Sequence, residues 1–233
     1  AERTVNKEMN KLLETDEEDY VIAIDTDSLY IRMGELVQKF NPKNPVKFLD
    51  EICKTHFEKV LTKSYQEFAD YSGAMSNRME MGREVIADKG IWQAKKRYIL
   101  NVHNSEGVQY AKPKLKIMGI EAIKSSTPEL VRNKMKELFP ILVGKTQDEA
   151  QSFVANFRKE FSEIRPEDIA FPRGVRHVKK YKDNKNIYTK GTPIHSRGSL
   201  LHNHYVEKHQ LTKRYEMIGN GEKIKFCYLK TPN

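Results

Sequence analysis

The sequence predicts an α+β protein: an antiparallel β-hairpin and further strands packed on helices, then a mainly helical second half with a small β element. In the first half, short apolar runs bounded by turn residues indicate strands. Between and after them, apolar residues recur every three or four positions, which indicates amphipathic helices. A basic segment, Lys112–Lys116, crosses between the halves. We therefore expect two domains, residues 1–115 and 116–233.

Composition narrows the class of protein. The chain has 233 residues, of which 38% are hydrophobic and 31% charged, so a core can form but is expected to be divided. No apolar run approaches the roughly 18 residues of a membrane span, and we expect no membrane contact. The net charge of +9 suits binding to a polyanion, although a generic basic surface gives the same value. Cys53 and Cys227 are too far apart in sequence to indicate a metal site or a disulfide framework.

The N-terminal elements follow in order. Apolar spacing predicts a helix over residues 3–14. Two apolar runs, Tyr20–Ile24 and Leu29–Ile31, then flank a turn and predict a hairpin. Asn44 is a suitable N-cap for a long helix over residues 45–68 that has Pro45 in its first turn.

The hairpin turn, Asp25-Thr26-Asp27-Ser28, carries the first chemical signal. Residues two apart on an extended chain point the same way, so Asp25 and Asp27 could present two carboxylates together. Carboxylate oxygens suit Mg²⁺, and two such ions roughly 3.5–4 Å apart can clamp both oxygens of a phosphoryl transfer. Ordinary turn chemistry explains the same residues, so this pattern leaves both interpretations open.

The middle of the chain predicts three strands: residues 79–86, which contain Glu84, residues 92–102 and residues 108–111. The second would carry the run Lys95-Lys96-Arg97-Tyr98, with positive charge on both of its faces. Such a run suits phosphate binding, because arginine grips phosphate with two hydrogen bonds and lysine acts as a point charge. A solvated edge strand protected by lysines explains it equally well.

The second half predicts helices that begin after Thr127 and Thr146, the latter in a capping box with Glu149. Residues 173–190 are predicted to be a mobile basic loop that orders on DNA. Strands are expected at 211–219 and 223–229. His202, His204 and His209 have no further ligands at zinc spacing, so we expect no zinc site.

These motifs resemble, in the same order, those of family B DNA polymerases, and within that family the replicative polymerases of T4-like phages. The matching motifs extend over most of the chain and are Asp25–Ser28 with Tyr30, Arg83–Glu84, Lys95–Tyr98, Lys114–Gly119, Ser125–Pro128 and Pro193–Gly198. The resemblance implies that residues 1–115 are the C-terminal part of the polymerase palm and residues 116–233 the thumb. It also implies a turn at residues 193–198 before a thumb helix over residues 199–208.

The resemblance also implies a DNA-directed DNA polymerase, a nucleotidyltransferase of DNA replication. Asp27 would be the main metal ligand and Asp25 the second, with Glu84 as a third acidic residue. The site would hold two Mg²⁺ ions, shared with an aspartate from an earlier palm strand. Primer–template DNA would contact residues of both halves: Lys95, Lys96, Arg97, Tyr98, Lys112, Lys114, Lys116, Lys124 and Arg197.

Several family motifs are not found, among them Ser-Leu-Tyr-Pro, Asn-Ser-x-Tyr-Gly, a fingers helix and an acidic exonuclease site. We therefore expect a C-terminal fragment or subunit of a phage polymerase that is split between two chains. It would be inactive without an N-terminal half that supplies the exonuclease, the fingers and the rest of the palm. The deoxynucleoside triphosphate (dNTP) would bind only to the assembled enzyme, in the cytoplasm of the infected bacterium.

Two departures from the family concern the site itself: Ile24 replaces a small residue, and the stretch between Glu84 and Lys95 is shorter and poorer in glycine. The family's clamp-binding tail is also not found. The palm edge left without its other strands would be exposed, and copies of the chain could associate through it. The alternative function is a non-catalytic module that binds duplex DNA without sequence preference and keeps the acidic hairpin as scaffold.

Overall fold

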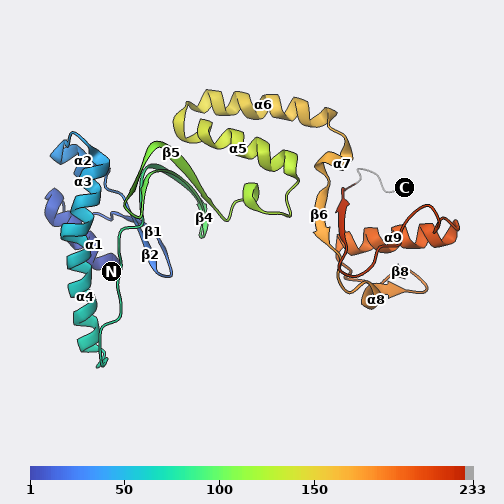
Figure 1. Ribbon diagram of the computed structural model, residues 1–233, viewed down its shortest axis with the longest axis horizontal. Coiled ribbons are helices and arrows are strands. Elements are labelled where there is room, and N and C mark those ends of the chain that lie inside the picture. The colour runs from blue at the N-terminus through green and yellow to red at the C-terminus, as the bar shows by residue number, and fades with distance from the viewer. Residues whose placement is uncertain (229–233) are drawn as a thin grey trace. The chain divides into compact units, whose positions relative to one another are not determined.

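A computed structural model describes residues 1–228 (Figure 1). The chain divides into two compact units, the first spanning residues 1–118 and the second beginning at Gly119. Both units combine helices with small antiparallel sheets, which confirms the predicted α+β class. Within residues 1–228, no helix is both long enough and apolar enough to cross a bilayer.

The first unit consists of helices, a hairpin and a three-stranded sheet. Strands β1 and β2 form the predicted hairpin, and β3, β4 and β5 pair in that order as an antiparallel sheet. The bounds are α1 (Glu2–Leu13), β1 (Val21–Asp25), β2 (Ser28–Ile31), α2 (Gly34–Phe40), α3 (Pro45–Ile52), the π-helix η1 (Cys53–Phe57), α4 (Glu58–Tyr71), β3 (Val85–Ala94), β4 (Arg97–Ser105) and β5 (Val108–Met118).

The hairpin packs between two apolar clusters of this unit. Because successive strand residues point to opposite faces, Leu29 and Ile31 contact one cluster while Tyr30 contacts the other. The first cluster joins α1, α2, α4 and the base of the hairpin through Val5, Met9, Tyr20, Val21, Leu36, Phe57 and Leu61. The second lies on the sheet and is built from Tyr98, Leu100 and Val102.

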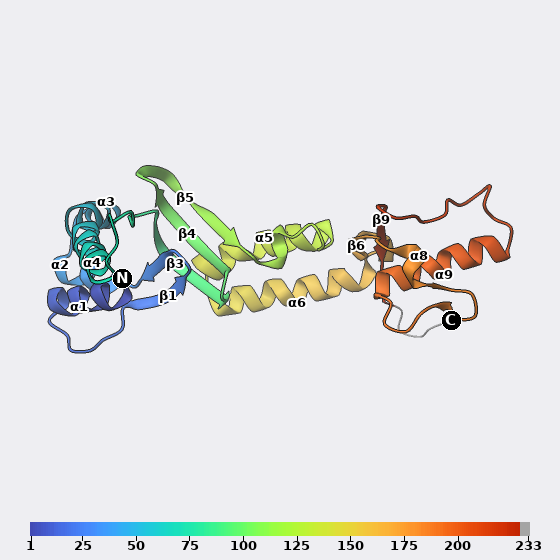
Figure 2. The same cartoon turned by 90° about the horizontal axis from the view of Figure 1, so that it is seen from below.

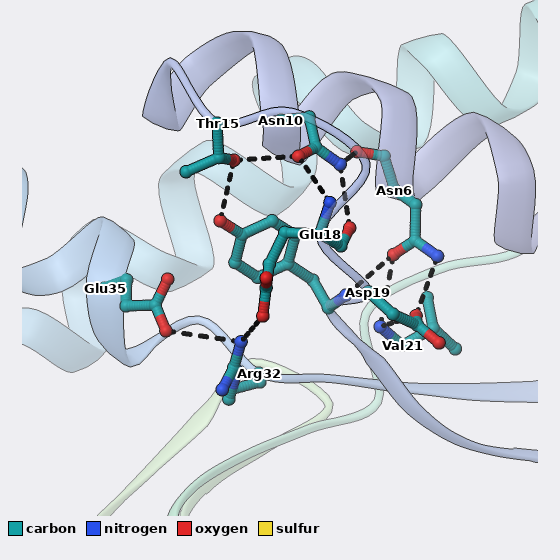
Figure 3. A network of polar contacts seen from close by, with 9 residues as sticks. Asn6, Asn10, Thr15, Glu18, Asp19, Val21, Arg32 and Glu35 are labelled. Carbon is teal, nitrogen blue, oxygen red and sulfur yellow. Dashed lines mark hydrogen bonds and ion pairs between the residues drawn. The ribbon is translucent and has the colours of Figure 1, made fainter.

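A polar network fixes the base of the hairpin to α1 (Figure 3). Asn6 Oδ1 accepts hydrogen bonds from the backbone N–H groups of Tyr20, at 2.9 Å, and Val21, at 3.2 Å. On the second strand's side, Arg32 contacts Glu18 at 2.8 Å and Glu35 at 3.3 Å. The start and the end of the hairpin are therefore both held, which fixes the direction in which its tip points.

The predicted long helix is interrupted. Its N-cap is confirmed, because Asn44 Oδ1 accepts the Lys47 N–H at 3.0 Å and Pro45 occupies the first turn. The helix then passes through the π-helical turn η1 before continuing as α4. A π-turn contains one extra residue, a feature that apolar spacing did not predict.

The strand predictions need three corrections. Residues 79–84 are irregular, because β4 ends opposite Val85 and leaves the preceding residues no strand to pair with. Lys95 and Lys96 form the turn between β3 and β4 and are not inside a strand; Lys96 has a φ of 61°. β5 continues to Met118, well beyond Ala111, because β4 offers it partners as far as Tyr98.

The second unit has two long helices, α5 and α6, which lie side by side in both views (Figures 1 and 2). Two short strand pairs form, β6 with β9 and β7 with β8, and helix α9 contacts a strand of each pair. The bounds are η2 (Glu121–Ile123), α5 (Glu129–Gly144), α6 (Gln147–Glu163), α7 (Pro166–Ile169), β6 (Phe171–Gly174), α8 (Val178–Tyr181), β7 (Lys182–Asp183), β8 (Ile187–Tyr188), α9 (Ile194–Lys208) and β9 (Lys223–Phe226).

The capping box of α6 is confirmed: Thr146 Oγ1 accepts the Glu149 N–H at 3.3 Å, and Glu149 Oε2 accepts the Thr146 N–H at 3.1 Å. The predicted Thr127 cap is wrong, because α5 begins at Glu129 without a side-chain cap. The predicted turn at 193–198 is also wrong. Pro193 stands at the N-cap of α9, whose first turns include the remainder of that motif.

Two further predictions for the second unit are corrected. The expected loop at residues 173–190 contains the short elements β6, α8, β7 and β8. Residues 211–219 form no strand; β9 pairs with β6, which is nearly fifty residues away in the sequence. Residue 229, the expected end of the last strand, lies outside the described residues.

Candidate active site

The acidic tip of the β1–β2 hairpin is a tight turn. Asp25 ends β1 opposite Ser28, and the Asp27 N–H donates to the Asp25 carbonyl oxygen at 2.6 Å. Ser28 Oγ donates to the same carbonyl at 3.1 Å, as expected for a short polar side chain in a turn. Thr26 has a left-handed φ of 51°, so the chain is not extended between the two aspartates. Both carboxylates therefore lie at the tip of the hairpin. The rule that residues two apart in a strand point the same way does not apply to them, because the chain turns at Thr26.

The basic turn between β3 and β4 lies beside Asp25. Lys96 Nζ is 3.5 Å from Asp25 Oδ1. The hairpin and this turn together enclose a pocket of about 330 Å³, whose lining includes Ile22, Ile24, Asp25 and Tyr30 on one side and Trp92, Lys95, Lys96 and Tyr98 on the other. Two motifs that are distant in the sequence are therefore adjacent in the fold.

Tyr98 lies within the wall of this site, where only 7% of it is exposed. Its ring packs edge-on against Tyr30, with centroids 5.3 Å apart, and Trp92 packs against the same Tyr30 ring at 5.5 Å. Burial, a hydrogen bond with Tyr30 and the charges of Glu84 and Asp25 all raise the pKa of the Tyr98 phenol. Tyr98 therefore stays neutral, and the carboxylates of Asp25 and Glu84 both lie near its hydroxyl.

Glu84 precedes β3 and reaches across to β5, where its carboxylate forms an ion pair with Lys116 Nζ. Lys116 pairs opposite Leu100 and Lys114 opposite Val102, so both lysines lie on the sheet face that carries Tyr98. Lys114 and Lys112 are exposed, and Lys114 Nζ lies 4.3 Å from the centroid of the Tyr110 ring.

The remaining candidate residues lie in the second unit and are held by local contacts. Lys124 forms an ion pair with Glu121 at 2.9 Å. Arg197 Nε donates to the Thr192 carbonyl oxygen at 2.8 Å, and the guanidinium lies 5.6 Å from the centroid of the Tyr188 ring.

The carboxylates of the first unit suit part of a Mg²⁺ site. Asp27 is exposed, and within residues 1–228 it has no ion pair or side-chain hydrogen bond, so its oxygens are available to a cation. Asp25 already has Lys96 as its counter-ion. No group of three or more His, Cys, Asp or Glu side chains in the described part of the chain could hold a metal ion. An ion at this tip would therefore need a further oxygen ligand from elsewhere.

Sequence reasoning missed the residues that support this site. Trp92 and Ile22 line the pocket, and a cluster of Asp50, Arg83 and Asn104 lies next to Glu84. Arg83 was noticed only as part of a motif. The sequence signal that could have identified it was a carboxylate at Asp50 on the buried side of the long helix.

Gly90 leaves room for the Trp92 ring. A Cβ at this position would lie 2.4 Å from Trp92 Cζ3 and 2.8 Å from Leu100 Cδ2. We expect Gly90→Ala to displace Trp92 and lower the free energy of unfolding by about 1–3 kcal/mol, the usual cost of overpacking. Urea unfolding monitored by tryptophan fluorescence would measure both effects. Gly34→Ala is the control, because its Cβ meets nothing within 4 Å; equal stability of the two variants would contradict the prediction.

The chain was compared with protein-family models and with known proteins. No family model matches the chain. The DNA-directed DNA polymerase of Enterobacteria phage T4 is 33% identical over 218 residues, covering 88% of this chain and 24% of that protein. The DNA-directed DNA polymerase of Escherichia phage RB69 is 34% identical over 246 aligned residues, covering 100% of this chain and 27% of that protein. The chain spans about a quarter of the length of these relatives, and its resemblance to a partial region of the T4-like phage DNA polymerases is confirmed.

Proposed function

We propose that this chain is the C-terminal palm-and-thumb part of a family B phage DNA polymerase. It supplies a metal-binding aspartate and grips primer–template duplex once an N-terminal half is present. The observation that carries the proposal is the meeting of the acidic hairpin tip with the basic turn, where Asp25 and Lys96 are 3.5 Å apart. Similarity to the T4 and RB69 polymerases over most of the chain supports it.

In the proposed reaction, the primer 3′-hydroxyl loses its proton to water and its oxygen attacks the α-phosphorus of the incoming dNTP. The bond from that phosphorus to the oxygen bridging to the β-phosphate breaks, and pyrophosphate leaves. Asp27, and after it Asp25, offers carboxylate oxygens to Mg²⁺ together with an aspartate of the other half. When bound, two such ions stabilise the charge on the attacking and leaving oxygens. Lys96 holds Asp25 in place, while Lys95, Lys96 and Arg97 lie where a primer backbone could pass the hairpin tip.

The N-terminal half is the proposed partner, and β1 offers a surface for it. Ile22 and Ile24, on one face of β1, are 50% and 45% exposed, which is unusual for isoleucines beside a candidate active site. A strand or loop of the missing palm would cover them. In the isolated chain the same face could instead mediate self-association. Residues 1–115 would be the palm portion and residues 116–233 the thumb, in contact with the duplex.

Duplex binding is expected to depend steeply on salt and not on base sequence, because the proposed contacts are to phosphates. The slope of log K against log[salt] is negative, and its magnitude should decrease by about 0.9 for each contact removed. We therefore expect a decrease of roughly 2–3 for the triple change Lys95→Gln, Lys96→Gln and Arg97→Gln. Fluorescence anisotropy of a labelled duplex would measure it. The control is Lys47→Gln, Lys59→Gln and Lys63→Gln, three exposed lysines on α3 and α4. An equal slope in both triple variants would contradict the role of the basic turn.

A non-catalytic duplex-binding module is the second candidate. The Asp25–Lys96 ion pair favours it, since a carboxylate neutralised by lysine needs no metal ion. The two functions differ in the role of Asp27: only the polymerase requires its negative charge.

A further inference from the structure

We propose that Arg83 is a positioning residue. It fixes the backbone of Glu84, and through the Glu84 carboxylate it restrains the Lys116 ammonium on the sheet face that carries the candidate active site. The π-helical turn η1 brings together Asp50 and Glu58, the two helix side chains that hold Arg83 and that we call its cradle. The functional meaning of this restraint rests on the proposed duplex binding, whereas the positioning itself does not.

The Arg83 side chain is a buried three-way contact. Only 6% of it is exposed, and its Nη2 forms an ion pair with Asp50 of α3. Its Nη1 donates to Asn104 Oδ1 of β4 at 2.8 Å and to the Glu84 carbonyl oxygen at 3.2 Å. One guanidinium therefore ties a helix, the end of a strand and the backbone of Glu84 together, as its planar set of donors allows.

The backbone around Arg83 is held from both sides as well. Glu58 Oε1 of α4 accepts the Arg83 N–H at 2.9 Å. The Glu84 carbonyl oxygen also accepts the Glu106 N–H at 2.7 Å. Residues 83–84 are thus fixed in position although they belong to no helix or strand.

The π-turn brings Asp50 and Glu58 to one face of the helix. In a regular α-helix each residue rotates by about 100°, so residues eight apart would differ by about 80°. The extra residue of a π-turn takes up roughly one residue's rotation, which leaves the two side chains within about 20° of each other. Asp50 then meets the guanidinium while Glu58 meets the N–H of the same residue.

Charge keeps this cradle in place near neutral pH. Burial raises the pKa of Asp50, but hydrogen bonds from Lys54 and Arg83 outweigh it, so the pKa lies below its usual value. Asp50 is therefore anionic at neutral pH, where DNA binding would be measured.

Glu84 passes the restraint on to β5. Its carboxylate holds Lys116 Nζ, on the sheet face where Leu100 and Tyr98 also lie. While Glu84 is fixed, Lys116 is neutralised and is not available to a phosphate. Release of Glu84 would free one cation beside the site.

The first test measures the coupling between Glu84 and Lys116 without DNA. A double-mutant cycle of Glu84→Gln and Lys116→Gln in urea unfolding should show a coupling of about twofold to fivefold in the unfolding constant, the range for an exposed ion pair. In an Arg83→Lys background this coupling should disappear, while in an Arg78→Lys background it should remain, because Arg78 is exposed in the same segment. If Arg83→Lys does not fold, Asn104→Ala removes one anchor of the guanidinium instead. A coupling that survives loss of the anchor overturns the proposal.

The second test uses a labelled DNA duplex. Glu84→Gln should steepen the slope of log K against log[salt] by about 0.9, the value for one added phosphate contact. Arg83→Lys should change the slope in the same direction, and the change should vanish when Lys116→Gln is added. An Arg83→Lys variant that loses stability but keeps the wild-type slope assigns Arg83 a purely structural role and overturns its proposed effect on Lys116. If the chain binds no duplex but the coupling depends on Arg83, duplex binding fails and the positioning stands.

Discussion

In the proposed two-chain polymerase, Asp27→Asn is expected to lower primer extension about a thousandfold, while affinity for primer–template duplex stays within about twofold. A bound metal ion contributes several kcal/mol to the stabilisation of transition-state charge, and every 1.36 kcal/mol is tenfold in rate. Asparagine has the shape of aspartate without its charge. Because Asp27 is exposed, the change should alter folding by no more than about 0.5 kcal/mol.

The measurement is single-turnover primer extension after the chain is mixed with a separately expressed N-terminal half. Asp16→Asn, at an exposed carboxylate in the loop after α1, is the matched control and should extend primers normally. Asp25→Asn should have a smaller effect than Asp27→Asn, since Lys96 already neutralises Asp25. Full synthesis by the Asp27→Asn enzyme would remove Asp27 from the mechanism and favour the non-catalytic module.

The second large effect concerns stability. Arg83→Met should lower the free energy of unfolding of the first unit by about 1–3 kcal/mol, because Asn104 and the Glu84 carbonyl oxygen lose a buried donor and Asp50 keeps only Lys54, at 3.1 Å, as its counter-ion. Arg83 is the more deeply buried partner, and Asn104, which is 4% exposed, would lose one of the two hydrogen bonds that its Oδ1 accepts. Urea unfolding monitored by Trp92, the only tryptophan of the chain, reports on this unit directly.

The pH dependence identifies the charge as the cause. The pKa of Asp50 in the folded protein lies below its ordinary value of 3.8, so the ion pair contributes stability above about pH 4. That contribution is lost as the pH falls through the folded-state pKa. The deficit of Arg83→Met should therefore be largest at neutral pH and shrink in acid. Leu61→Ala, which removes a buried apolar side chain, should lower the free energy of unfolding by the same amount at acid and neutral pH. If the loss caused by Arg83→Met were equally independent of pH, the explanation by charge would be contradicted.

Local chemistry was enough to predict the elements that depend on neighbouring residues. The apolar run before Asp25 and the turn residues after it specify the hairpin. Asn44 with Pro45, and Thr146 with Glu149, specify helix starts through bonds that span three residues. The order of the motifs identified the resemblance to T4-like polymerases. The signals for the hairpin and for the two helix starts each lie within a few residues of the feature that they predict.

The tertiary structure decided which residues meet. The extent of β3 and β5 depends on where β4 offers backbone partners, and β4 is a separate segment of the chain. The contacts of Arg83 with Glu58 and Asp50 and the contact of Asp25 with Lys96 likewise join residues that are 25 or more positions apart. A single sequence contains the residue types for such contacts but not their pairing, because pairing is set by the packing of the hairpin between the helices and the sheet.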